Sequence, residues 1–168
     1  MRRGGKAALG LVAVTTLAGA ACRGRLALAH THESPQAVAR AVVQGLAARD
    51  IAALRDLALS EPEFRELVWP KLPASRPERN VPWDYAWNDL RAKSDAHLRA
   101  LLGRWQDHGF EIVSVSFLGE TTEYGTFRVH RDTAVSLRDR DGQEQTGRLF
   151  GSMIEMNGGF KVFSYVVD

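Results

Sequence analysis

The chain has 168 residues and a formal net charge of only +2 at pH 7, from 22 basic and 20 acidic side chains. Three of the basic residues lie within the first six positions, so 19 basic and 20 acidic side chains remain from Cys22 onward. A nearly neutral chain lacks the basic excess that neutralises nucleic-acid phosphates, and nucleic acid is therefore not expected as a partner.

The first 21 residues have the pattern of a secretory signal. Arg2, Arg3 and Lys6 precede an uncharged run over residues 7–21. A positive start followed by an apolar segment of about 7 to 15 residues is typical of export signals, and this run is too short to span, as a helix, a hydrocarbon core of about 30 Å. We therefore expect a signal peptide over residues 1–21 and an exported protein.

Cys22, the only cysteine, follows four small residues at positions 18–21. This arrangement resembles the lipobox of bacterial lipoproteins, which implies that Cys22 becomes a lipidated first residue and holds the protein on the membrane. A lone cysteine fits this role, since it cannot form an internal disulfide and an exposed thiol is a liability in an oxidising compartment. The lipoprotein would face the periplasm or the cell exterior.

Two other outcomes of processing stay open. Ala27-Leu28-Ala29 is a small-x-small cleavage site that would leave His30 as the first residue of a soluble periplasmic or secreted protein. The third outcome is an uncleaved anchor.

Residues 22–33 are expected to form a flexible tether, and residues 34–168 a single domain of the usual size. His30, His32 and Glu33 could chelate a divalent ion, but a polar, mobile leader is the favoured interpretation. We expect neither a metal nor another cofactor.

The first half of the domain has helical spacing. Ser34 followed by Pro35 is a helix-start signal, and apolar residues recur at helical intervals over residues 35–48. Asp50 then caps a second helix, in which Ile51 begins the apolar face.

Ser60 and Glu63 form the sequence pattern of a capping box, which predicts a short third helix. Four prolines between residues 69 and 83 then predict an ordered or semi-ordered loop. Beyond it, apolar residues three or four apart predict one long helix over residues 84–107, with Gly109 just past its end.

The second half alternates apolar and polar residues, which is typical of strands. Asp141-Gly142 and Asn157-Gly158-Gly159 are tight-turn signals between predicted strands. Four long strands are predicted, over residues 111–118, 124–138, 145–156 and 160–167. The fold class is thus α+β, with N-terminal helices and a four-stranded antiparallel meander.

This order resembles the nuclear-transport-factor-2-like superfamily, a cone-shaped α+β domain. Residues 41–54 look like the opening helix pair of that family, a helix ending in a small-small-charged-Asp step into a second helix. Residues 157–162 are similar to its final hairpin, a glycine turn followed by an aromatic residue and Lys. The resemblance implies helices packed on a curved four-stranded antiparallel sheet, with a pocket between them. It carries over no catalytic residue.

Arg128, His130 and Asp132 are the strongest candidates for chemistry. They alternate on one face of a predicted strand, so that the imidazole could sit between a guanidinium and a carboxylate, the usual general-base arrangement. Because the opposite face is apolar, the favoured interpretation is that the Arg-His-Asp face is simply the solvated side.

Trp83, Tyr85 and Trp87 form an aromatic run beside the prolines. Packing in the core is the favoured interpretation, since large aromatic side chains dominate core energetics. The alternative is that all three line an apolar ligand pocket, with Asp84 or Arg91 as its polar contact.

Three functions follow. The lack of a convergent catalytic set favours a lipid-anchored, non-catalytic binding or interaction domain at the cell envelope, with the membrane as partner through Cys22 and an envelope protein as a second partner. The first alternative is a binder of a small apolar ligand in a cone-fold pocket. The second is an acid-base enzyme of isomerase or dehydratase type that uses His130 and Asp132.

Overall fold

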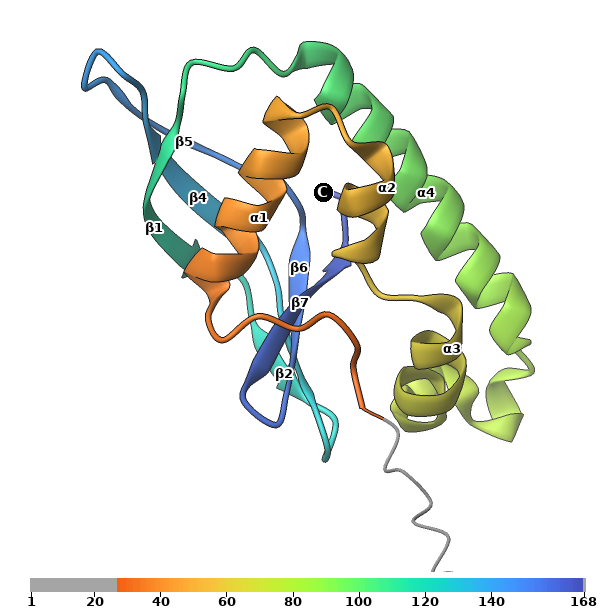
Figure 1. Ribbon diagram of the computed structural model, residues 1–168. Coiled ribbons are helices and arrows are strands. Elements are labelled where there is room, and N and C mark those ends of the chain that lie inside the picture. Colours follow the sequence, from red (N-terminus) through yellow and green to blue (C-terminus); the bar gives the residue numbers. More distant parts are fainter. Residues whose placement is uncertain (1–26, 168) are drawn as a thin grey trace, which may run out of the picture.

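The computed structural model describes residues 27–167, in which helices come first and two antiparallel sheets follow (Figure 1). The α+β class predicted from the sequence is confirmed. The predicted signal peptide and Cys22 lie outside the described residues. Within residues 27–167, no helix combines the length and the apolar composition needed to cross a membrane.

The helical half begins with short helices and ends with one long helix that runs along the outer side of the molecule, past α2 and α3 (Figure 1). The α-helices are α1 (Pro35–Ala47), α2 (Ile51–Asp56), α3 (Glu61–Glu63) and α4 (Trp83–Arg104). A π-helical turn, η1 (Phe64–Val68), continues α3. The proline-rich loop is ordered as three 3-10 turns, η2 (Trp69–Lys71), η3 (Pro73–Ser75) and η4 (Pro77–Arg79).

The caps predicted for the first two helices are confirmed. The Ser34 hydroxyl accepts a hydrogen bond of 3.2 Å from the Ala37 N–H, and the Asp50 carboxylate accepts one of 3.0 Å from the Ala53 N–H. These bonds satisfy N–H groups that have no partner within the first turn of a helix. Both helices therefore start where local side-chain chemistry places them.

The strands are shorter and more numerous than the alternation predicts. The described residues contain β1 (Glu111–Phe117), β2 (Thr121–Glu123), β3 (Arg128–His130), β4 (Thr133–Arg138), β5 (Glu144–Gly147), β6 (Ser152–Met156) and β7 (Gly159–Ser164). One sheet has the order β1-β4-β5 and the other the order β2-β3-β6-β7. The expectation of one four-stranded meander is corrected to seven strands in two sheets.

Two of the predicted strands are wrong because the chain passes from one sheet to the other within each. The strand predicted over 124–138 breaks at Asp132, whose φ of 55° lies in the left-handed region and ends the extended run. The strand predicted over 145–156 breaks between β5 and β6. Gly151, the last residue before β6, accepts a hydrogen bond from the Thr133 N–H. The two breaks therefore face each other at the corner between the sheets.

The core consists of two clusters on opposite faces of the β2-β3-β6-β7 sheet. Met153 and Val162 point into the first cluster, which α1 covers, whereas Val129 and Ile154 point into the second, which also contains Trp87 of α4. Both faces of this sheet are thus covered. An alternating pattern predicts one solvated face, and that expectation fails wherever helices cover both sides.

A buried ion pair joins the two halves of the fold. Lys161 of β7 is 2% exposed, and its Nζ lies 3.0 and 2.9 Å from the two carboxylate oxygens of Glu63. Glu63 also accepts hydrogen bonds from the backbone N–H and the hydroxyl of Ser60, which completes the predicted capping box. One carboxylate thereby starts α3 and ties it to the sheet.

The segment before α1 is held on the domain. Leu28 is buried in the second cluster, and the Ala29 N–H donates a 2.7 Å hydrogen bond to Glu63. His32 and Phe160 exchange two backbone hydrogen bonds, of 2.8 and 2.7 Å. The described part of the segment for which the sequence predicts a tether thus contacts the domain through Leu28, Ala29 and His32.

The network around Glu63 predicts a loss of stability in acid. Burial alone would raise the pKa of Glu63, but hydrogen bonds from Ser60, Lys161 and Ala29 favour the charged carboxylate and together hold this pKa below its usual value of 4.5. A carboxylate with a lowered pKa stabilises the fold fully above the pKa of the unfolded chain. That stabilisation disappears as the pH falls through the lower pKa of the folded state.

We therefore expect the difference in Tm between the wild type and Glu63→Gln to be large at pH 6 and to shrink toward pH 3. Thermal unfolding followed by circular dichroism at pH 6, 5, 4 and 3 measures this difference. A difference that stays constant over this range would show that the ionised form of Glu63 is not what stabilises the fold.

Candidate ligand-binding site

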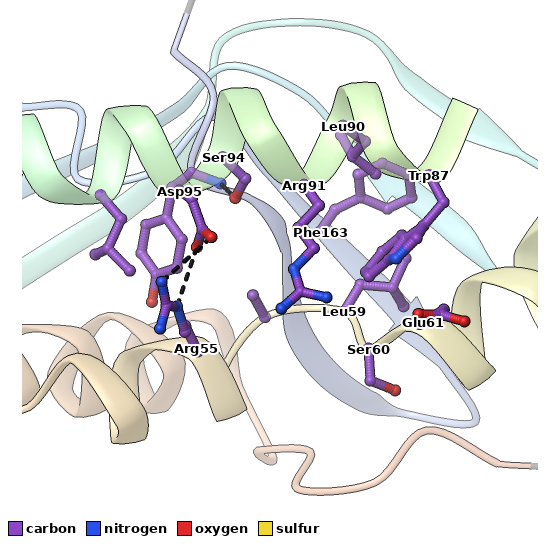
Figure 2. A pocket seen from close by; sticks show the side chains of 13 residues that line it. Arg55, Leu59, Ser60, Glu61, Trp87, Leu90, Arg91, Ser94, Asp95 and Phe163 are labelled. Atoms are coloured by element: carbon purple, nitrogen blue, oxygen red, sulfur yellow. Dashed lines mark hydrogen bonds and ion pairs between the residues drawn. The ribbon is translucent and has the colours of Figure 1, made fainter. Parts of the chain in front are cut away.

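A cavity of about 220 Å³ lies between α4 and the segment that joins α2 to α3 (Figure 2). We call it the α4 cavity. Its apolar lining comes from Leu59, Trp87, Leu90, Leu98, Phe163 and Tyr165, and charged or hydroxyl side chains lie around it. Such a mixture, mostly apolar with a few polar groups, is typical of small-molecule sites.

The two walls of the α4 cavity are built in different ways. On α4, the lining positions Trp87, Leu90, Ser94 and Leu98 fall three or four residues apart, which places them on one face of the helix. On the other wall, residues 57–59 run beside β7, because the Leu59 N–H donates to the Val162 carbonyl and the Val162 N–H donates to the Leu57 carbonyl. These two backbone hydrogen bonds hold the second wall of the α4 cavity against β7.

Tyr165 lines the α4 cavity and has a structural role. Its hydroxyl donates a 2.6 Å hydrogen bond to the Leu54 carbonyl, and its backbone N–H donates one of 3.0 Å to the Ser94 hydroxyl. Burial raises the pKa of Tyr165 well above its ordinary value of 10.0, so the phenol stays neutral. Its hydroxyl therefore holds the segment that follows β7 against α2.

An ion pair between α2 and α4 closes one end of the α4 cavity (Figure 2). Arg55 Nε lies 3.1 Å from Asp95 Oδ1, and the Arg55 Nη2 atom lies 3.2 Å from Asp95 Oδ2. This two-point geometry fixes both side chains. The charges of Arg55 and Asp95 therefore neutralise each other.

Arg91 and Glu61 are the other two charged residues that line the α4 cavity. Figure 2 shows the Arg91 side chain reaching from α4 toward the segment that carries Leu59 and Ser60, and it shows Glu61 beside Trp87. Within residues 27–167, neither charged group has a hydrogen bond or an ion pair. One positive and one negative group are thus available beside an apolar surface.

The structure brings together only part of the predicted aromatic site. Trp87 and Arg91 line the α4 cavity, as the alternative interpretation expects. Trp83 packs instead in the second core cluster with the Arg65 guanidinium 5.5 Å from its ring, and Tyr85 is 70% exposed. A residue two positions from Trp87 on a helix lies on the far side, which explains the exposure of Tyr85.

Several residues of the site are absent from the sequence prediction. Phe163 and Arg55 come from segments far from α4 in the chain, and only the packing of β7 and α2 brings them there. Asp95, however, follows Arg91 by four residues, and this spacing on α4 was a usable signal.

His130 lies elsewhere, and its surroundings differ from those predicted. It is buried at 8% exposure, its ring stacks on Phe117 with 4.4 Å between centroids, and its two nitrogens each lie 2.9 Å from a partner, Thr121 Oγ1 and Glu155 Oε2. The expectation that the Arg-His-Asp face is solvated is wrong for His130, because Phe117 covers the ring.

Asp132 does not act as the partner of His130. The break in the strand turns its carboxylate to Arg148, at 3.3 Å. Arg128 pairs with Glu123 at 2.8 Å and with Glu155 at 3.5 Å. The carboxylate next to the imidazole is therefore Glu155, which the alternation does not predict because it lies on another strand.

No group of three or more His, Cys, Asp or Glu side chains in the described part of the chain is arranged to hold a metal ion. No protein-family model, curated protein or solved structure matches the sequence or fold of this chain.

Proposed function

We propose that the protein is an exported, lipid-anchored, non-catalytic binding domain of the cell envelope, which holds a small ligand with an apolar body in the α4 cavity. The cavity itself carries this proposal. It has a volume of about 220 Å³, and large apolar side chains, among them Trp87 and Phe163, line it. A cavity of this size fits a molecule smaller than a typical drug.

The docking of the N-terminal segment supports the lipid anchor. Cleavage after Ala29 would leave His30 first and would remove both buried Leu28 and the N–H group that Ala29 donates to Glu63. Cleavage before Cys22 keeps both contacts. The described contacts thus favour the lipoprotein over the soluble form.

The surroundings of His130 favour binding over acid-base catalysis. Both ring nitrogens of His130 already have a partner, and Phe117 stacks on the ring. A general base needs a nitrogen within hydrogen-bond reach of its substrate. The alternative enzyme would also need Asp132, whose carboxylate is paired with Arg148.

We also propose the nuclear-transport-factor-2-like superfamily as the fold family. Its support is the helix pair joined at Asp50, the closing hairpin between β6 and β7, and a cavity between helices and sheet. The division of the strands into two sheets is the point at which the chain departs from one curved four-stranded sheet.

The binding proposal predicts that 3-phenyl-1-propanol, a neutral molecule with an apolar ring, binds in the α4 cavity with a Kd of about 1 mM, as expected for a ligand of about ten non-hydrogen atoms. The chain from residue 23 is suitable for this titration, because it keeps all of residues 27–167. The chain has four tryptophans, and the buried indole N–H of Trp87 has no hydrogen-bond partner in the described region. Its NMR resonance should shift saturably during the titration, while that of distant Trp105 stays unchanged.

Two matched variants test whether the ligand binds in the α4 cavity. Ala58→Phe adds a ring to a half-buried position that lines the α4 cavity, and should weaken binding at least tenfold. Ala52→Phe adds the same ring on the exposed side of α2 and should leave the Kd unchanged. The proposal fails if the Trp87 resonance does not shift, or if Ala58→Phe binds as the wild type does.

A further inference from the structure

The charges around the α4 cavity indicate what kind of polar group its ligand carries. Arg55 and Asp95 neutralise each other at one end through two hydrogen bonds. Arg91 and Glu61 line the same cavity, and no ion pair or hydrogen bond occupies either charged group within residues 27–167. The cavity therefore offers one positive and one negative group that are not joined to each other.

Each of these groups has a chemical preference. A guanidinium presents paired N–H donors that match a carboxylate, so Arg91 suits a carboxylate. A carboxylate accepts hydrogen bonds from an ammonium group, so Glu61 suits a primary ammonium. A ligand with a negative charge alone would bring its carboxylate near Glu61, and a ligand with a positive charge alone would bring its ammonium near Arg91. Among charged ligands, only one that carries both charges avoids such an unfavourable contact.

We infer that the ligand of the α4 cavity is an apolar α-amino acid bound as its zwitterion. Its carboxylate pairs with Arg91 and its ammonium with Glu61, while its side chain lies against Trp87, Leu90 and Phe163. A volume of about 220 Å³ accommodates one amino acid of the size of phenylalanine. This inference rests on the proposed binding function and adds the chemical class of the ligand.

The test compares four probes that share a phenyl ring and differ in charge: phenylalanine, 3-phenylpropionate, phenethylammonium and neutral 3-phenyl-1-propanol. The chain from residue 23 is titrated with each, and the indole resonance of Trp87 gives the Kd. We expect phenylalanine to bind at least about tenfold more tightly than each of the other three, because one hydrogen bond to a charged group contributes about a factor of ten or more.

Substitutions at the two charged residues test whether Arg91 and Glu61 are responsible for the tighter binding of phenylalanine. Arg91→Met and Glu61→Gln should each weaken phenylalanine binding about tenfold and leave the Kd of 3-phenyl-1-propanol unchanged. Arg99→Met on the exposed surface of α4 and Glu78→Gln in η4 are the matched controls, since neither residue lines the α4 cavity, and both should bind phenylalanine as the wild type does.

The outcomes separate the inference from the proposed function. If 3-phenyl-1-propanol binds as tightly as phenylalanine, the α4 cavity is still a binding site, but the inference of a zwitterionic ligand is overturned. Equal binding of 3-phenylpropionate and phenylalanine, with no effect of Glu61→Gln, would also overturn it. If none of the four probes shifts the Trp87 resonance, both the inference and the proposed function fail.

Discussion

Replacing Glu63 by Gln should lower the free energy of unfolding by about 3–5 kcal/mol, the usual cost of removing one partner of a buried ion pair. The substitution leaves the Lys161 ammonium, which is 2% exposed, without a countercharge. It also removes one of the acceptors that hold Ser60 and Ala29. Urea unfolding at pH 7, followed by circular dichroism, measures the loss.

Two controls test whether the loss of stability comes from the burial of the ion pair and from the unpaired charge of Lys161. Glu66→Gln breaks the exposed pair between Glu66 and Arg65 and should cost less than about 1 kcal/mol, because ion pairs in water contribute little. Adding Lys161→Met to Glu63→Gln removes the unpaired ammonium and should recover a large part of the lost stability. A loss below 1 kcal/mol for Glu63→Gln alone would contradict the prediction.

Gly151→Ala should destabilise the fold by about 3 kcal/mol or more, since forcing extra atoms into a filled space is costly and here the obstacle is backbone. A Cβ atom at Gly151 would overlap the carbonyl oxygen of Val166. Gly151 also bonds through its backbone to Ser164 and Thr133, at the corner between the two sheets. A methyl group there would push the segment that follows β7 away from the start of β6.

Gly147→Ala is the matched control. Gly147 belongs to the exposed strand β5, and a Cβ atom there meets nothing within 4 Å. We expect a change in stability of less than about 0.5 kcal/mol for this variant, as for most surface substitutions. Equal effects of the two substitutions in urea unfolding would show that the close approach at Gly151 is not important for stability.

The helical half was predictable because its signals are local. Ser34, Asp50 and the pair Ser60 and Glu63 cap the helices that follow them, and each cap depends on residues three positions apart. The helical spacing predicts an end at residue 107, whereas α4 ends at Arg104. Helix ends are the part that local chemistry determines least.

The breaks in the sheet depend on packing between distant segments. Alternation continues through Asp132 and Gly151, so it predicts continuous strands, whereas the chain turns there to enter a second sheet. A glycine inside a strand pattern often indicates a close backbone approach, and Gly151 carried that signal. The same packing covers His130, which the alternation places on a solvated face.

In the candidate site, too, one part follows from local spacing and the other from packing between distant segments. Spacing on one helix was sufficient to put Trp87 and Arg91 on a common face, and both line the α4 cavity. The opposite wall comes from residues 57–59 and from Phe163, whose positions depend on the pairing with β7. No pattern within either segment indicates that they meet.

The docked N-terminal segment also limits where the protein can act. If Cys22 carries the lipid, only residues 23–27 separate the anchor from buried Leu28. Five residues extend at most about 18 Å, at roughly 3.5 Å each. Leu28 would then stay within about two nanometres of the bilayer surface. The protein would therefore meet its ligand next to the membrane and pass it on only to a neighbour at the same bilayer.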